Sequence, residues 1–257
     1  MFRYKKIGFI KILDIWFEEE LFYTAQSSIK CLHENKVLDK KKYDFALVGK
    51  TFILDISREP SEIFNGFSYK SCKYAINKAT RDGIHVWKAE KDDEKIEYMR
   101  FQNSFSREKK IAEISSDELA GVDVFCAETQ DKTFLGGCAF VLSDDNMTVR
   151  YKHGATSHML NANEAILWEA IKFYHSRGVA YFDFGGVVIT DDKSSYYYRH
   201  YKFKEKFGGE LADSYTYFRM KGKWKIAYFF FKLLLMCFWR GDVNNFVNWL
   251  NRYGMLK

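Results

Sequence analysis

Residues 181–211 read YFDFGGVVITDDKSSYYYRHYKFKEKFGGEL and are the most informative stretch of the chain. An apolar run typical of a β-strand ends in a glycine pair at 185–186, and a Phe-Lys step (Phe203, Lys204) precedes a second pair at 208–209. Glycine has no Cβ and tolerates positive φ, so each pair allows the backbone to pass close to another group. A lysine held between two such passages has the rigid position that an electrostatic catalyst requires.

Two side chains of this stretch are candidates for chemistry. Lys204 is suited to stabilising an oxyanion or holding a phosphate, whereas the alternative is a solvated basic face. In an extended segment Lys202, Lys204 and Lys206 would share one side, because successive side chains alternate. Asp183 follows the expected strand and is a candidate base or amine-positioning group. The alternative is an aspartate that forms the turn before the glycines.

The segment RYKHGATSHMLNANEA, residues 150–165, indicates an anion site. A strand leads through a loop into a helix N-terminus, where free N–H groups and the helix dipole favour negative charge. Small residues allow close backbone approach, and two hydroxyls can donate hydrogen bonds. The candidate donor-binding residues here are Gly154, Ala155, Thr156 and Ser157. An ordinary capped strand–helix connection is the alternative.

Residues 70–81 form an expected basic helix, because apolar positions recur at helical spacing opposite four basic residues. Such a face can meet phosphates by charge alone, or it can simply be solvated. We take four residues from this helix and from the 181–211 stretch as candidate substrate-binding residues: Lys78, Arg81, Tyr198 and Arg199.

The remaining pattern alternates strand and helix signals. Two β-prone runs flank Gly49-Lys50 and predict a hairpin over 44–56. Short turns at 130–132 and 143–146 predict a three-stranded antiparallel meander. Further elements are expected as strands at 85–89, 179–186 and 214–220, helices at 92–110, 116–120 and 161–178, a short helix or irregular segment at 194–207, and a helical C-terminus.

Composition sets limits on the class of protein. The chain has 257 residues, a net charge of +6 and 18% aromatic residues, which favours a packed globule over disorder. The five scattered cysteines contain no CxxC pair, so we expect reduced, mostly buried thiols. His153 and His158 lack partners at ligand spacing, so no metal site is predicted.

Neither end of the chain predicts a membrane span. The N-terminal apolar run is interrupted by Lys11 and Asp14, which makes it a poor signal peptide. The apolar window 226–239 would reach only about 21 Å as a helix, short of the ~30 Å hydrocarbon core. With basic flanks and Trp224 and Trp239 near its ends, segment 224–239 instead suggests a peripheral contact with the inner face of the cell membrane. A core-packing helix is the alternative.

Taken in order, these pieces resemble the Fem-type peptidoglycan aminoacyltransferases and their relatives in the GNAT acyltransferase superfamily. Four segments between about residues 43 and 220 carry the resemblance: KSCKYAINKATRDGIHV, VFCAETQDKTFLGGCAFVL, RYKHGAT with the helix and strand that follow, and YYYRHYKFKEKFGGEL. The chain is shorter than the two-lobed Fem enzymes and has no long helical-hairpin insertion of the kind that some of them carry for tRNA. Its counterpart of the GNAT pyrophosphate loop departs from the usual spacing, since Arg150 is followed only at 154–155 by Gly-Ala.

The resemblance implies an α/β (α+β), GNAT-like fold with a mixed, mostly antiparallel sheet flanked by helices. It implies a reduced first lobe over 1–90, a GNAT-like lobe over 91–220 and a C-terminal helical segment over 221–257. Phe203 and Lys204 match the family's Phe-Lys step, which implies that Lys204 stabilises the oxyanion of a tetrahedral intermediate. Arg150 joins the donor-binding residues, and Gly185-Gly186 becomes the cleft wall beside the donor.

The implied activity is transfer of an acyl or aminoacyl group to an amine of a cell-envelope precursor, either peptidoglycan or a surface-polysaccharide amino sugar. Acyl-CoA and aminoacyl-tRNA both remain open as the co-substrate, and no permanently bound cofactor or metal is expected. The expected location is the cytoplasm. A different class of function is a non-catalytic binding protein on a GNAT-like scaffold, associated with membrane-linked saccharide, since fold alone does not decide function.

Overall fold

The structure is a computed structural model that describes residues 2–7, 10–157 and 161–238, with side chains over 11–157 and 161–231. It contains two compact units. The terminal unit comprises residues 1–49 and 213–257, and the central unit comprises residues 50–212. Strand β10 returns to pair with the N-terminal strand β3. The division into lobes over 1–90, 91–220 and 221–257 stays a prediction.

The terminal unit has the strand order β1-β2-β3-β10. The pairs β1–β2 and β3–β10 are antiparallel, whereas β2–β3 is parallel. Its core includes Leu13, Ile15, Phe22, Leu32 and Tyr217. Its elements are β1 (Phe2–Ile7), β2 (Ile10–Trp16), α1 (Glu19–Thr24), β3 (Ile29–Glu34), a short 3-10 turn (Lys40–Lys42), β10 (Glu210–Met220) and α7 (Lys223–Phe238).

The central unit has the strand order β4-β9-β8-β7-β6-β5. All neighbours are antiparallel except β8–β9, which are parallel over three residues, 148–150 and 181–183. The strands are β4 (Phe45–Asp55), β5 (His85–Lys88), β6 (Asp123–Glu128), β7 (Phe134–Leu142), β8 (Thr148–Thr156) and β9 (Tyr181–Val187).

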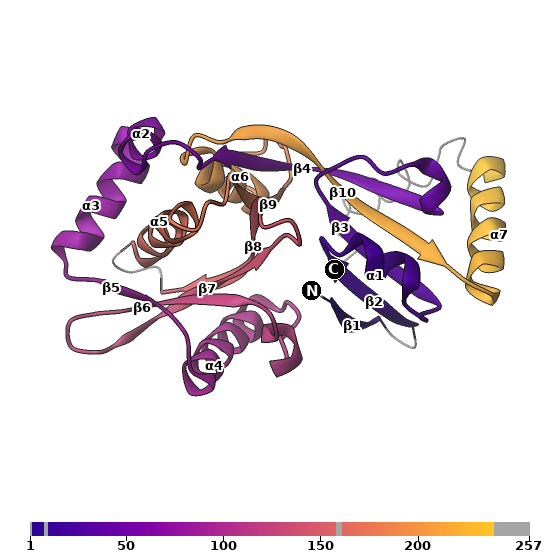
Figure 1. The fold of residues 1–257 in the computed structure, drawn as a ribbon, viewed down its shortest axis with the longest axis horizontal. Coiled ribbons are helices and arrows are strands. Elements are labelled where there is room, and N and C mark those ends of the chain that lie inside the picture. Colours follow the sequence, from indigo (N-terminus) through magenta and orange to yellow (C-terminus); the bar gives the residue numbers. More distant parts are fainter. Residues whose placement is uncertain (1, 8–9, 158–160, 239–257) are drawn as a thin grey trace. The chain divides into compact units, whose positions relative to one another are not determined.

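Helices cover both faces of the central sheet, with α4 (Asp92–Lys109) on one face and α5 (Ala162–His175) on the other (Figure 1). Helix α5 buries Ile166, Leu167 and Ile171 in the same core cluster as Phe140 and Phe182. The remaining helices are α2 (Pro60–Gly66), a π-helical turn (Tyr69–Lys73), α3 (Tyr74–Arg81), a 3-10 turn (Ser116–Leu119) and α6 (Tyr196–Glu205). The expected mixed α/β class is confirmed.

One local prediction is wrong. Instead of a hairpin, residues 45–55 form the single strand β4. A two-residue hairpin turn needs positive φ, and Gly49 is not among the residues that have it. The meander, the basic helix at 74–81 and the helices at 92–109 and 162–175 agree with the sequence pattern.

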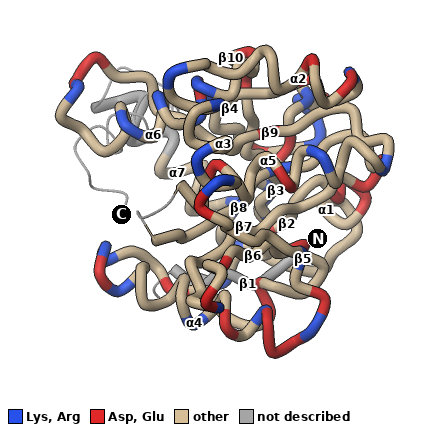
Figure 2. The backbone as a smooth tube through the Cα atoms, turned by 90° about the vertical axis from the view of Figure 1, so that its left-hand side faces the viewer, with Lys and Arg blue, Asp and Glu red and all other residues tan. Residues whose placement is uncertain are grey.

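Acidic and basic positions are interspersed along the backbone rather than gathered on one element; α4, for example, carries both signs (Figure 2). The four cysteines whose side chains are described are free and buried, as expected: Cys31, Cys72, Cys126 and Cys138. Cys237 lies outside that part of the chain. No helix among the described residues is long and apolar enough to cross a bilayer.

Candidate active site

Helix α6 carries Lys204 into the interior of the central unit. The Ser195 hydroxyl caps the helix by accepting a hydrogen bond from the Tyr198 N–H. Because the segment is helical and turns about 100° per residue, the three lysines do not share one side. Lys204 is only 5% exposed, whereas Lys202 is exposed and pairs with Glu205. The same turn contains Phe203, which packs against the central core.

The Lys204 ammonium is held by the first glycine pair. Its Nζ donates to the carbonyl oxygens of Gly185 at 3.1 Å and Gly186 at 2.9 Å, and it lies 5.9 Å from the centre of the Tyr151 ring. An ammonium has three N–H donors. Within the described residues the third finds no acceptor, so the geometry leaves one donor for a ligand.

Burial changes the acidity of this lysine. Desolvation lowers the pKa of Lys204 from 10.5 to about 8; the positive charge of Arg150 acts in the same direction, and the charge of Asp183 opposes it. At neutral pH the group remains mostly protonated. A cation buried in a water-poor site interacts more strongly with a developing negative charge than it would in water.

A buried ion pair lies beside this lysine. Asp183 is fully buried, Arg150 is 4% exposed, and the Arg150 Nε donates to the Asp183 carboxylate. The parallel register places the two residues directly opposite each other on β8 and β9. The other carboxylate oxygen accepts from the Thr51 hydroxyl and from the Gly185 N–H, the latter at 2.8 Å. The pair therefore joins β4, β8 and β9.

Both glycine pairs meet backbone closely, as predicted. Gly185 has φ +74°, and a Cβ there would lie 2.7 Å from the Tyr151 carbonyl oxygen. Gly208 has φ +75° and approaches the Gly66 carbonyl in the same way, while a Cβ on Gly209 would lie 3.0 Å from the Ile53 carbonyl. A side chain at Gly185 would separate β9 from β8 and displace the carbonyls that hold Lys204.

The predicted donor-binding residues fall into two places. Arg150, Gly185 and Gly186 lie around Lys204. Thr156 and Ser157 instead line a groove of about 600 Å³, together with residues of α4 and of the β6–β7 turn such as Phe101 and Asp131. Gly154 and Ala155 lie in β8, between the Lys204 site and the groove along the chain. Both residues pair with β7. The donor-binding role of all seven remains a prediction.

The four predicted substrate-binding residues lie on two helices. Lys78 and Arg81 are in the last turn of α3, where Lys78 pairs with Asp82 at 2.6 Å and Arg81 lies over the Tyr74 ring. Tyr198 and Arg199 are in the first turn of α6. Among the described residues no hydrogen bond, ion pair or ring contact joins the two pairs, and their role stays a prediction.

Sequence reasoning missed Thr51 and Tyr151. The Thr51 hydroxyl contacts both Asp183 and the Gly185 carbonyl, the latter at 2.9 Å. A buried hydroxyl in an apolar strand, as in KTFIL at 50–54, is the signal that points to Thr51. No sequence signal points to Tyr151. Its place in the site is visible only in the structure, where its carbonyl lies close to Gly185.

Comparison with solved structures identifies the fold. FemX superimposes with a TM-score of 0.58 at 12% sequence identity, covering 83% of each chain. The chain shares the Fem-type fold. L-PGS from Bacillus licheniformis matches with a TM-score of 0.55 at 12% identity, over 88% of this chain and 82% of that one.

A third similar structure is the C-terminal domain of a putative lysylphosphatidylglycerol synthetase from Agrobacterium fabrum, with a TM-score of 0.55, 12% identity and coverage of 89% and 83%. No family model and no curated protein sequence matches the chain. The resemblance inferred from the four segments is thus confirmed at the level of the fold, at identities too low to carry an activity over.

Proposed function

We propose that this protein transfers an acyl or aminoacyl group from acyl-CoA or aminoacyl-tRNA to an amine of a cell-envelope precursor, either peptidoglycan or a surface-polysaccharide amino sugar. The observation that carries the proposal is the buried Lys204 ammonium with one N–H left for a ligand. The Fem-type fold supports it, as does the structural similarity to the C-terminal domain of a putative lysylphosphatidylglycerol synthetase.

In the proposed reaction the neutral amine of the acceptor attacks the carbonyl carbon of the donor. A C–N bond forms, and one electron pair moves onto the carbonyl oxygen. The third N–H of Lys204 stabilises that oxyanion, a type of interaction worth about 3–4 kcal/mol. Collapse of the intermediate expels the thiolate of CoA or the ribose oxygen of tRNA, and the amine loses its proton to a base.

Asp183 was the sequence candidate for that base. Its two carboxylate oxygens already accept hydrogen bonds from Arg150, Thr51 and the Gly185 N–H. Taking a proton would require one of these bonds to break inside a buried site. This geometry supports a positioning role for Asp183, in which it fixes the strand that holds Lys204, better than a role as base.

The donor is proposed to lie along β8. Thr156 at the groove is about 17 Å along β8 from Tyr151, since a strand rises about 3.3 Å per residue. A long donor with a phosphate-bearing end near Ser157 would reach the Lys204 site with its carbonyl. Both candidate donors have this form.

Donor binding tests the proposal. In calorimetric titrations of the full chain, we expect saturable binding of either short-chain acyl-CoA thioesters or a non-hydrolysable aminoacyl-tRNA analogue. We also expect transfer of the labelled acyl group to an amino-sugar or peptidoglycan-stem amine. Binding of neither donor would reject the enzyme and leave the non-catalytic saccharide-binding protein as the surviving function.

The second proposal concerns contact with a membrane through α7. Tyr228 stacks on Phe45 with ring centres 5.0 Å apart, so this face packs within the terminal unit. Ile226, Phe229 and Phe230 are 58–60% exposed. Exposed aromatics on a helix with basic residues at its start are typical of interfacial helices. Trp239 and Arg240, the other flank of the predicted contact, lie outside the described residues.

We expect the double substitution Phe229→Ser, Phe230→Ser to reduce co-sedimentation with anionic phosphatidylglycerol vesicles at least tenfold, because each buried aromatic contributes about 1.5–3 kcal/mol. The matched control is Ile111→Ser, an exposed apolar residue of the central unit. Equal co-sedimentation of the double variant and the unmodified chain would show that α7 does not contact the membrane.

A further inference from the structure

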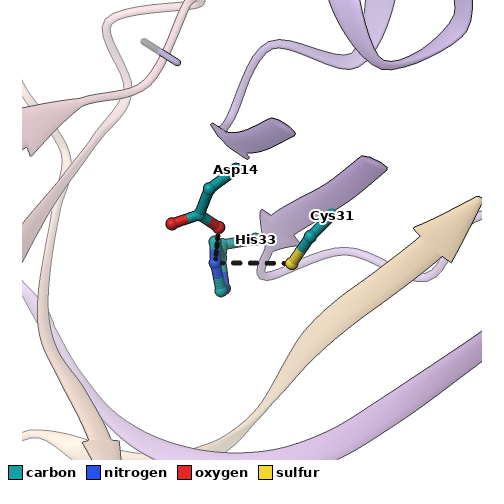
Figure 3. Close-up of side chains that lie close together, drawn as sticks. All are labelled: Asp14, Cys31 and His33. Atoms are coloured by element: carbon teal, nitrogen blue, oxygen red, sulfur yellow. Dashed lines mark hydrogen bonds and ion pairs between the residues drawn. The ribbon is translucent and has the colours of Figure 1, made fainter. Parts of the chain in front are cut away.

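We propose that Asp14, Cys31 and His33 in the terminal unit bind a single Zn²⁺ ion. Each residue offers one ligand atom: a carboxylate oxygen, a thiol sulfur and an imidazole nitrogen. These three atoms lie within 4.8 Å of one another. Figure 3 shows the three side chains converging from β2 and β3. All three are among the ligand types that zinc uses in proteins.

The sheet register explains why these residues meet. β2 and β3 are parallel neighbours, and Asp14 lies directly opposite Cys31. Cys31 and His33 are two residues apart on β3, so their side chains emerge on the same face. Asp14 and Cys31 are buried, and the His33 side chain is 21% exposed. The site is therefore built into the sheet, and its histidine borders solvent.

The geometry around His33 fits a metal better than a nucleophile. His33 Nε2 lies 2.6 Å from the Asp14 Oδ1 and 3.6 Å from the Cys31 Sγ. In a Cys–His–Asp catalytic arrangement the thiol and the carboxylate use different ring nitrogens. Here both meet Nε2, which carries at most one hydrogen. One cation can instead be bound by this nitrogen, the sulfur and the carboxylate oxygen together.

The distances agree with a tetrahedral ion. Zn–S of about 2.3 Å and Zn–N of about 2.05 Å at a tetrahedral angle place sulfur and nitrogen roughly 3.6 Å apart. The Cys31–His33 separation is 3.6 Å. The corresponding nitrogen–oxygen separation is roughly 3.4 Å, so Asp14 would move by less than 1 Å from its 2.6 Å contact.

The surroundings fix the histidine in the required orientation. Nδ1 lies 3.2 Å from the Thr216 hydroxyl, which is opposite His33 on β10. Trp16 stacks on the ring, with centres 4.1 Å apart. A partner on the second ring nitrogen is the usual outer contact of a metal-binding histidine. Three protein ligands leave a fourth position for water.

The donor set selects the metal. A thiolate ligand disfavours Mg²⁺ and Ca²⁺, which take oxygen ligands, and a mixed sulfur, nitrogen and oxygen set suits Zn²⁺. The sequence signal is the Cys-x-His spacing at 31–33, which aligns two ligands only if the segment is a strand. The expectation of no metal rested on the lack of a CxxC pair and of ligand partners for His153 and His158, and neither criterion applies to a Cys-x-His pair on a strand.

Metal titration of the full, chelator-stripped chain tests the site. With Co²⁺ as a probe we expect one ion per chain and a thiolate-to-cobalt charge-transfer band that Zn²⁺ abolishes. Cys31→Ser is expected to remove the band and weaken Zn²⁺ binding at least 100-fold, measured by competition with a chromogenic chelator. Thr216→Val keeps all three ligands and is expected to weaken binding 10- to 100-fold.

Cys126→Ser is the matched control, because Cys126 is an equally buried free thiol on β6 of the central unit. It is expected to bind Co²⁺ and Zn²⁺ as the unmodified chain does. Absence of the charge-transfer band in the unmodified chain would overturn the proposal, as would unchanged Zn²⁺ affinity in Cys31→Ser. If Cys31→Ser fails to fold, the unmodified chain and Thr216→Val decide the question.

Discussion

Replacing Lys204 with methionine is expected to lower turnover of acyl transfer by one to three orders of magnitude while the fold stays intact. Methionine is similar in length and apolar, so it fills the buried space without the charge. The loss corresponds to one preorganised donor to an oxyanion, which contributes about 10²–10³ in rate. Because burial of the Lys204 ammonium is unfavourable, the variant should unfold at no lower urea concentration than the unmodified chain.

The pH profile separates catalysis from structure. With a pKa of about 8, Lys204 loses its charge as the pH rises through 8, so turnover should fall above that pH. Stability should change in the opposite direction. Between pH 8 and 10.5 the unfolded chain holds a proton that the folded chain has lost, so the free energy of unfolding rises with pH. Lost activity above pH 8 would therefore not reflect unfolding.

Lys202→Met is the matched control, since Lys202 lies on the same helix but is exposed and paired with Glu205 at 2.6 Å. Surface ion pairs contribute at most about 1 kcal/mol, so activity and stability should stay near those of the unmodified chain. Two results would contradict the proposed role of Lys204. One is that Lys204→Met turns over as fast as the unmodified chain, and the other is that the activity of this variant still falls above pH 8.

The elements that sequence predicts well are those fixed by local chemistry. Helix α5 was expected over 161–178 and spans Ala162–His175, because its apolar spacing and the following Gly178 are local signals. The meander follows from two short turns with turn-forming residues. The sequence also predicted that the backbone at Gly185 passes close to another group. It did not predict that this group is the Tyr151 carbonyl.

The site itself depends on contacts that no local pattern contains. Thr51 and Asp183 are 132 residues apart in sequence and meet only because β4 pairs with β9. The choice of Lys204 among three neighbouring lysines depends on which face of α6 packs inward, and a basic helix with a weak apolar stripe does not reveal that face. Pairing of β10 with β3 is equally non-local, since Thr216 and the opposite residue His33 are 183 residues apart in sequence.

Asp183→Asn is expected to lower the free energy of unfolding by about 3–5 kcal/mol, measured by urea denaturation. Removing the carboxylate charge leaves the buried Arg150 cation without its counter-charge on β9, and that penalty exceeds the value of the pair itself. The asparagine oxygen can still accept from Thr51 and the Gly185 N–H, as the aspartate does. Its amide nitrogen would then face the Arg150 Nε, donor against donor. Glu169→Gln, in an exposed pair with Lys172, is the matched control.

A double variant distinguishes the charge effect from lost packing. Adding Arg150→Met to Asp183→Asn also removes the buried cation, and a buried ion pair replaced by uncharged groups is often neutral in stability. We therefore expect the double variant to be more stable than Asp183→Asn alone by at least 1 kcal/mol, a coupling typical of directly contacting residues. If Asp183→Asn costs less than about 1 kcal/mol, or Arg150→Met gives no recovery, the ion pair does not hold β8 to β9. The fixed position of the glycine carbonyls around Lys204 would then need another cause.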